Sequence, residues 1–250
     1  MEIGAQFYTI RDFCQTAEGL AESLARVADI GYKTVQLSGV SAAYDAQFIK
    51  QELEKNGLRC VLTHIAGDRL QNDPVGVAAD HDIFDCRYVG LGHFPMNDGD
   101  GSGSYAEFLQ LYRPVMQALK AQGKYFMYHN HDHELRWING HTFLEQMAED
   151  IPADEMGFTL DTFWVQAGGG DPAQYIEKLS GRVPCIHLKD FAFGRKMAVI
   201  GEGNINFDRV FEKAEAAGTQ YMLVEQDDCN GEDPFACLKR SYQYLKSCGF

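Results

Sequence analysis

One segment shows both how this chain folds and where its chemistry lies: Tyr125-Phe126-Met127-Tyr128-His129-Asn130-His131-Asp132-His133-Glu134. It begins as an aromatic strand and ends in side chains that bind metals or move protons. Because side chains alternate along a strand, three of its imidazoles lie on one face. Burying such a row is costly unless the rings are hydrogen-bonded, paired with carboxylates or bound to a metal. A solvated histidine-rich loop is the alternative for this segment taken alone.

Short apolar strands and amphipathic helices alternate along the whole chain, with no linker or composition break. Besides the histidine-rich strand, the expected strands are Ile3–Tyr8, Thr34–Leu37, Arg59–Ile65, Arg87–Phe94, Gly157–Asp161, Pro184–Asp190 and Gln220–Gln226. The expected helices are Glu18–Ile30, one through Phe48, Ile49 and Leu53, Asp73–Phe84, Tyr105–Ala121, Thr142–Glu149, Pro172–Leu179, Phe207–Ala217 and Pro234–Lys246. Long connections are expected at Asn97–Ser104 and Asp190–Asn206.

Eight strand–helix units in 250 residues predict a single α/β domain over residues 1–250, closed as a (β/α)₈ TIM barrel. A doubly wound open sheet is the alternative. That fold is usually accompanied by a GxGxxG motif after its first strand, and Ile3–Ile10 contains none.

The bulk composition narrows the classes of partner and compartment. The net charge of −14 argues against nucleic acid as the main partner, since phosphate binding needs lysine and arginine. Seven scattered cysteines suggest neither a disulfide framework nor a thiolate metal site. Without a secretory signal or a membrane-spanning run, we expect a cytoplasmic protein that binds no membrane. The oligomeric state is left open between a monomer, a homo-oligomer and a complex with a partner subunit.

Polar side chains stand at the ends of the apolar strands, where a barrel keeps its active site. In chain order they are Gln6, Tyr8, Gln36, His64, His93, His129, His131, Glu134, Asp161, His187, Lys189, Asp190, Glu225 and Asp227. In a barrel these side chains converge on one mouth.

Three of these residues form an oxygen and nitrogen ligand set for a divalent metal: Asp161, His187 and Glu225. A fourth ligand is expected from the fifth strand, with positions left open for substrate. Taken singly, Asp161 can be a helix-capping residue, and His64 or His93 a hydrogen-bonded wall residue. Glu225 is less easily explained as a purely structural residue, because burying an unpaired carboxylate at the end of a strand costs free energy.

Several motifs together resemble the xylose-isomerase-like TIM barrels, also called the sugar phosphate isomerase/epimerase or family 2 AP-endonuclease fold. The resemblance covers essentially the whole chain. The motifs are Gln6-Phe7-Tyr8-Thr9-Ile10-Arg11-Asp12, Tyr128 to Glu134, Leu160-Asp161, His187-Leu188-Lys189-Asp190, Gly201-Glu202-Gly203-Asn204-Ile205-Asn206-Phe207 and Val224-Glu225-Gln226-Asp227. Members include ketose epimerases, aldose–ketose isomerases, inosose dehydratases, DNA-repair endonucleases and enzymes that cleave 3-keto-glycosides, some of them C-glycosides.

The resemblance implies one divalent metal ion, with Mn²⁺ preferred and Co²⁺, Mg²⁺ or Zn²⁺ as alternatives. The family holds it with Glu, Asp, His and Glu from strands five to eight, and Asp161, His187 and Glu225 match the last three. The family's strand-five Glu falls at or near His129 in this chain. Glu134 is therefore the expected fourth ligand, with His131 or His129 as its substitute.

The expected activity is that of a metal-dependent isomerase or epimerase acting on a sugar or cyclitol. It would remove a proton α to a carbonyl and pass through a metal-stabilised enediolate. His129, His131 and Lys189 are the candidate catalytic residues. Substrate binding is assigned to the polar residues at the mouth: Gln6, Tyr8, Arg11, Gln36, His64 and His93.

Other outcomes fit the same residues. A lyase, such as an inosose-type dehydratase or a 3-keto-glycoside- or C-glycoside-cleaving enzyme, would share the enediolate chemistry. A DNA-repair endonuclease and a non-catalytic sugar-binding barrel or partner subunit are the remaining alternatives. Arg11, Arg195 and Lys196 could receive a phosphate, although no glycine-rich phosphate motif requires one.

Overall fold

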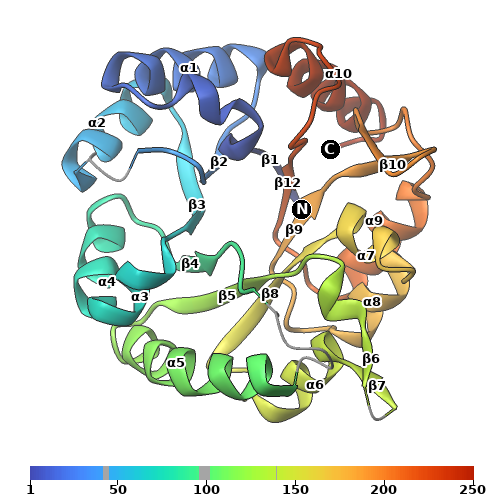
Figure 1. Ribbon diagram of the computed structural model, residues 1–250. Coiled ribbons are helices and arrows are strands. Elements are labelled where there is room, and N and C mark those ends of the chain that lie inside the picture. The colour runs from blue at the N-terminus through green and yellow to red at the C-terminus, as the bar shows by residue number, and fades with distance from the viewer. Residues whose placement is uncertain (42–44, 96–101, 139) are drawn as a thin grey trace.

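A computed structural model of the protein describes residues 1–41, 45–95, 102–138 and 140–250. Within these residues eight parallel strands close into a barrel surrounded by helices, which confirms the predicted TIM barrel (Figure 1). Around the ring the order is β1-β12-β9-β8-β5-β4-β3-β2. The barrel strands are β1 (Glu2–Gln6), β2 (Thr34–Leu37), β3 (Arg59–His64), β4 (Tyr88–Leu91), β5 (Tyr125–His129), β8 (Met156–Asp161), β9 (Cys185–Leu188) and β12 (Tyr221–Val224).

The helices begin and end where local sequence signals place them. For example, the Thr16 side chain accepts a hydrogen bond from the Gly19 amide at the start of α1, and Gly31 ends that helix with φ of 124°. The α-helices are α1 (Ala17–Ile30), α2 (Ala46–Asn56), α3 (Gly67–Asn72), α4 (Pro74–Ile83), α5 (Ser102–Ala121), α6 (Phe143–Asp150), α7 (Thr162–Ala167), α8 (Pro172–Lys178), α9 (Phe207–Ala216) and α10 (Pro234–Ser247). Across the described ranges, no helix combines the length and apolar character needed to cross a membrane.

The ring closes between its first and last strands. β1 pairs with β12 in parallel, from Glu2 opposite Tyr221 to Ala5 opposite Val224. On its other side β1 pairs with β2, which sets Gln6 beside Gln36. Both glutamines therefore lie at the carboxyl end of the barrel.

The apolar core has two parts. The larger one lies between the strands and the helices and includes Val35, Phe126 and Leu160. A smaller cluster that includes Leu62, Tyr88, Met127, Cys185 and Leu223 packs separately. These side chains lie on barrel strands, and with the interior filled by apolar groups the polar residues gather at the carboxyl ends.

The loops differ most from expectation. The first strand ends at Gln6 instead of Tyr8, because the Gln6 side chain accepts a hydrogen bond from the Tyr8 amide and starts a 3₁₀ helix, η1 (Phe7–Phe13). The expected loop 190–206 contains a hairpin of β10 (Asp190–Ala192) and β11 (Lys196–Ala198). Most of the expected loop 97–104 falls outside the described residues, and α5 begins at Ser102.

Two further elements follow the histidine-rich strand. They are the 3₁₀ helix η2 (His133–Leu135) and a hairpin of β6 (Trp137–Ile138) and β7 (His141–Thr142). The helices α3 and α7 were also absent from the sequence-based expectation. All these short elements lie in connections that follow barrel strands, so they shape the mouth and leave the ring unchanged.

Candidate metal centre and substrate pocket

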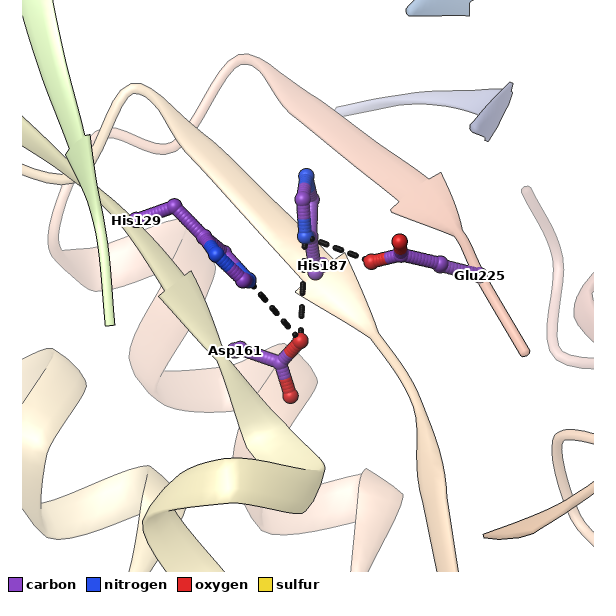
Figure 2. A group of neighbouring side chains, drawn as sticks. All are labelled: His129, Asp161, His187 and Glu225. Carbon is purple, nitrogen blue, oxygen red and sulfur yellow. Dashed lines mark hydrogen bonds and ion pairs between the residues drawn. The ribbon is translucent and has the colours of Figure 1, made fainter. Parts of the chain in front are cut away.

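Four buried side chains meet at the carboxyl end of the barrel: His129, Asp161, His187 and Glu225 (Figure 2). They come from β5, β8, β9 and the residue after β12, which are consecutive in the ring. One potential ligand atom from each lies within 4.8 Å of the others. The predicted convergence of Asp161, His187 and Glu225 is thus present in the structure.

Each histidine of this quartet is fixed by a carbonyl oxygen on the far side of its ring. His129 Nδ1 lies 2.9 Å from the Gly92 carbonyl, and His187 Nε2 lies 2.6 Å from Oε1 of Gln36. A carbonyl oxygen only accepts, so these nitrogens carry the protons. The other ring nitrogens, His129 Nε2 and His187 Nδ1, are therefore the ones directed toward the two carboxylates, as in histidines that bind metals.

The carboxylates are anchored in the same way, each through one oxygen. Asp161 Oδ1 accepts a hydrogen bond of 3.0 Å from the Trp164 amide and caps α7. Glu225 Oε1 accepts one of 2.6 Å from Nε2 of Gln6. The remaining oxygens, Asp161 Oδ2 and Glu225 Oε2, face His129 Nε2 and His187 Nδ1.

The inward-facing atoms are close but poorly satisfied. His187 Nδ1 lies 2.8 Å from Glu225 Oε2 and 3.7 Å from Asp161 Oδ2, and His129 Nε2 lies 3.2 Å from Asp161 Oδ2. In the described structure His187 Nδ1 and Glu225 Oε2 are buried without a hydrogen bond of acceptable geometry. Burial would lower the pKa of His187, but Glu225 and Asp161 raise it, so the inner nitrogen of His187 is stabilised by a proton or by a metal cation. The donor set therefore fits a divalent metal ion in place of that proton.

A protein cation shares this place. Lys189 Nζ lies 3.2 Å from Asp161 Oδ2, 3.1 Å from Glu225 Oε2 and 2.8 Å from Asp227 Oδ1. Burial alone would lower the pKa of Lys189, but the three carboxylates raise it above its usual value. Lys189 therefore stays charged and contacts two oxygens of the quartet.

The carboxylate pKa values follow from the same contacts. Burial would raise the pKa of Glu225, but Lys189 and His187 hold it below its usual range. Asp161 is likewise lowered, by Lys189 and His129 against the effect of burial. Asp227 differs, because its burial and the nearby Glu225 raise its pKa despite Lys189. Two carboxylates thus remain ionised where a metal would bind.

Glu134, expected as the fourth ligand, does not reach the quartet. Its carboxylate accepts hydrogen bonds from the Tyr128 hydroxyl at 2.6 Å and from the His131 amide at 2.8 Å. His133 Nε2 also lies 3.0 Å from Oε1 of this carboxylate. The residue that completes the quartet is His129, one of the two alternatives given for the fourth ligand, whereas Glu134 makes its contacts within the turn that follows β5.

The pocket above the quartet has a volume of about 620 Å³. Of the residues assigned to substrate, Tyr8, Arg11, His64 and His93 line it, together with the predicted catalytic residues His129, His131 and Lys189. Gln6 and Gln36 are placed differently. They are buried behind Glu225 and His187, where their amides orient the quartet instead of facing the pocket.

His131 and His64 form part of the pocket wall. Burial, with His129 and His93 nearby, lowers the pKa of His131 to about 2, so the ring is neutral. Burial also lowers the pKa of His64, whose Nδ1 lies 3.1 Å from the Ser38 hydroxyl. Among the described residues, neither His131 Nδ1 nor His64 Nε2 has a hydrogen-bond partner. Both nitrogens are buried in residues that line the pocket.

Trp164 and Asp227 also line the pocket and were not assigned a role from the sequence. The Trp164 ring lies 5.1 Å from the His131 ring and 5.7 Å from Lys189 Nζ, and its buried Nε1 has no partner within the described residues. Asp227 follows Glu225 by two positions, as a second polar residue after an apolar strand. The same pattern placed Asp227 among the residues expected at the mouth without giving it a role, whereas nothing in the sequence marks Trp164.

Comparison with known proteins agrees with this architecture. The family described as "Xylose isomerase-like TIM barrel" matches residues 24–248. No curated protein sequence matches the chain. A solved sugar phosphate isomerase/epimerase from Parabacteroides distasonis is similar over 99% of this chain and 94% of its own, with 19% identity and a TM-score of 0.84.

Two more solved structures carry more specific names. An L-ribulose 3-epimerase is similar over 99% of this chain and 94% of its own, with 16% identity and a TM-score of 0.74. The probable 3-DHS dehydratase AsbF from Bacillus anthracis is similar over 98% and 99%, with 13% identity and a TM-score of 0.73. At these identities the likeness establishes the fold.

Proposed function

Because the chain belongs to the xylose isomerase-like TIM barrel family, we propose that it is a divalent-metal-dependent isomerase or epimerase of a keto sugar or cyclitol. The observation that supports this most is the buried quartet of His129, Asp161, His187 and Glu225. All four side chains are held from behind, and their inward atoms lie beneath an open pocket. Preorganisation of this kind is typical of a catalytic metal site with room for substrate.

A bound divalent ion, with Mn²⁺ preferred over Co²⁺, Mg²⁺ or Zn²⁺, would polarise a substrate carbonyl and stabilise the charge of an enediolate. His131 is the proposed proton acceptor, because its ring lines the pocket and its Nδ1 has no partner in the described part of the chain. Glu225 is the alternative base. Lys189 would stay charged and donate hydrogen bonds to a developing oxyanion.

A lyase is the second candidate, and the position of Lys189 favours it. Its ammonium group lies against three carboxylates and 5.7 Å from the Trp164 ring in the pocket wall. From there it can give a proton to a departing hydroxyl or alkoxide while an imidazole takes the α-proton. Loss of a β-substituent would then replace return of the proton.

The direct experiment is incubation with keto sugars, inososes and 3-keto-glycosides in D₂O, with Mn²⁺ supplied. Deuterium incorporated without loss of a substituent would support the isomerase or epimerase. Loss of water or of an aglycone would support the lyase. Absence of both reactions across the panel would contradict the proposal.

Metal analysis tests the cofactor separately. Purified protein should contain one transition metal ion per chain, and Asp161→Asn should remove it. A chain that holds no metal in either form would favour a non-catalytic sugar-binding barrel. Retention on DNA at physiological salt would instead favour the nuclease alternative.

A further inference from the structure

We propose that the substrate of this pocket carries no phosphate group and is therefore a free sugar, a cyclitol or a glycoside. The inference rests on the proposed function and specifies its substrate class. Three features carry it: a backbone anion site filled by the protein itself, the commitment of the nearby cations, and the chemistry of the pocket wall.

The first feature is the loop after β9, the seventh strand of the ring. In TIM barrels the loops after strands seven and eight frequently bind a substrate phosphate through backbone amides. Here the amides of Gly201 and Gly203 both donate to Oδ2 of Asp190, each at 2.9 Å. Oδ1 of the same carboxylate accepts from the amides of Phe191 at 2.8 Å and Ile205 at 3.2 Å.

Asp190 is thus a built-in anion that takes up four amides of this loop. Its side chain is buried, so a phosphate could reach these amides only by expelling it. A second anion beside it would meet a like charge with no water to screen it. The glycine-rich loop is therefore a structural motif in this chain and offers no phosphate site.

The second feature is the shortage of available cations. Of the 22 lysines and arginines, none falls among the residues outside the described ranges, and only Arg11 and Lys189 line the pocket. Lys189 is held by three carboxylates. Arg11 donates through Nη1 to the carbonyls of Tyr8 at 2.8 Å and Asp227 at 3.1 Å, and its guanidinium lies 4.3 Å from the Tyr8 ring centre.

The remaining cations near the mouth are also unsuited to phosphate. Arg195 pairs with Asp132 at 2.6 Å, and neither Arg195 nor Lys196 lines the pocket. On the opposite wall, Asp68 stands in the first turn of α3, directly after the lining residues Ala66 and Gly67. Its negative charge disfavours an anion there.

The third feature is what the wall does offer. The rings of His64, His131 and Trp164 line it, and their buried nitrogens His64 Nε2, His131 Nδ1 and Trp164 Nε1 have no partner within the described chain. Ile65 and Leu91 add apolar surface beside them. Imidazole and indole rings next to apolar side chains match the C–H faces and hydroxyls of a carbohydrate, whereas a phosphate would leave most of its charge unpaired.

The test compares a free ketohexose with its 6-phosphate by isothermal titration of the full-length, Mn²⁺-loaded protein. The two ligands share the carbonyl and every hydroxyl except the one at C6, so they differ mainly in the phosphate group. We expect the free sugar to bind at least about tenfold more tightly, because like charges oppose the phosphate. Tighter binding of the phosphate, or equal binding, overturns the inference.

A matched pair of variants tests the charge argument directly. Ala66 is exposed at the pocket wall, so Ala66→Lys adds a cation there and Ala66→Gln adds a neutral chain. Ala66→Lys should tighten binding of the 6-phosphate by about fivefold, as a partly exposed ion pair would, while Ala66→Gln should not. Equal effects of the two substitutions would contradict the inference.

Failure of this inference and failure of the proposed function give different results. If the 6-phosphate is preferred and its α-proton exchanges with D₂O, the proposed function stands and the inference falls. If free sugars bind preferentially but no exchange or elimination follows for any substrate, the inference stands and the proposed function falls. Binding of neither ligand overturns both.

Discussion

Nε2 of His187 donates a hydrogen bond of 2.6 Å to the side-chain carbonyl of Gln36, on the side of the ring opposite Glu225. The two residues are 151 positions apart, on β9 and β2 across the barrel. The same principle applies to every member of the quartet, since each has one atom bonded outward and one directed inward. The inner atoms are thus oriented before any ion arrives.

Replacing Gln36 by Leu should weaken metal binding without removing a ligand. His187 would lose the acceptor that fixes its tautomer, and we expect metal affinity to fall by about 10- to 100-fold. Titration calorimetry with Mn²⁺ measures this. Gln36→Glu keeps an acceptor at the same place and should retain most of the affinity. Equal losses in the two variants would show that the hydrogen bond is not what matters.

Lys189→Met should make the protein depend more strongly on metal. The ammonium balances Asp161 and Glu225, so its removal should cost about 3–5 kcal/mol of metal-free stability. Metal should restore much of that loss, because it contacts the same oxygens. Denaturant unfolding with and without Mn²⁺ measures both quantities.

The control for this variant is Lys124→Met. Lys124 is also buried, but its partners are Asp82 at 2.6 Å and the Cys86 carbonyl at 3.0 Å, away from the quartet. Lys124→Met should lower the free energy of unfolding without increasing the stabilisation that Mn²⁺ provides. If metal stabilises both variants to the same extent, Lys189 and the ion do not share carboxylates.

Substitution of Glu134 should affect stability, and substitution of His129 should affect metal content. Glu134→Gln should lower stability by about 1–3 kcal/mol, since the Tyr128 hydroxyl and the His131 amide lose a charged acceptor, but metal stoichiometry should stay at one per chain. His129→Ala should reduce metal content and leave the turn after β5 intact. The reverse pattern in metal analysis would restore Glu134 as the ligand.

Stability should fall in mild acid because of His81, a buried histidine that is not a member of the quartet. Its Nδ1 donates to the Val77 carbonyl at 2.7 Å, and its Nε2 lies 2.7 Å from the Thr63 hydroxyl, so the ring must be neutral to accept from it. Burial lowers the pKa of His81 to about 4 from 6.5. The unfolded chain therefore takes up a proton first as the pH falls.

The stabilising contribution of His81 is fully present above pH 6.5 and is lost progressively down to about pH 4. The full loss is about 3 kcal/mol. His81→Gln keeps a neutral donor and acceptor, so its unfolding free energy should depend less steeply on pH over this range. An unchanged slope in urea titrations at several pH values would exclude His81 as a source.

The ring of strands was predictable because periodicity and burial point the same way along each unit. Val35, Leu62 and Val224 lie in strands close to the expected bounds. The carboxyl ends of parallel strands must meet, so the convergence of Asp161, His187 and Glu225 followed from order alone. The arrangement of the strands can be predicted without knowing any side-chain torsion angle.

The fourth position was not predictable from residue type. Carboxylate is the more familiar ligand, which favoured Glu134, but a side chain five residues beyond His129 has already left the strand. Hydrogen bonds within the turn, from Tyr128 and the His131 amide, then decide its direction. The roles of Gln6 and Gln36 could not be predicted either, because their hydrogen-bond partners are on strands far away in the sequence.

The hydrogen bond from Gln6 to Glu225 joins positions 219 residues apart and spans the seam where β1 meets β12. A ribosome must therefore add 219 residues after Gln6 before Glu225 can dock beside the first strand. Nascent chains that already expose His129 and Asp161 lack the residue that completes the quartet. Metal acquisition should consequently be the final event of maturation, and the loaded ion a marker that folding has finished.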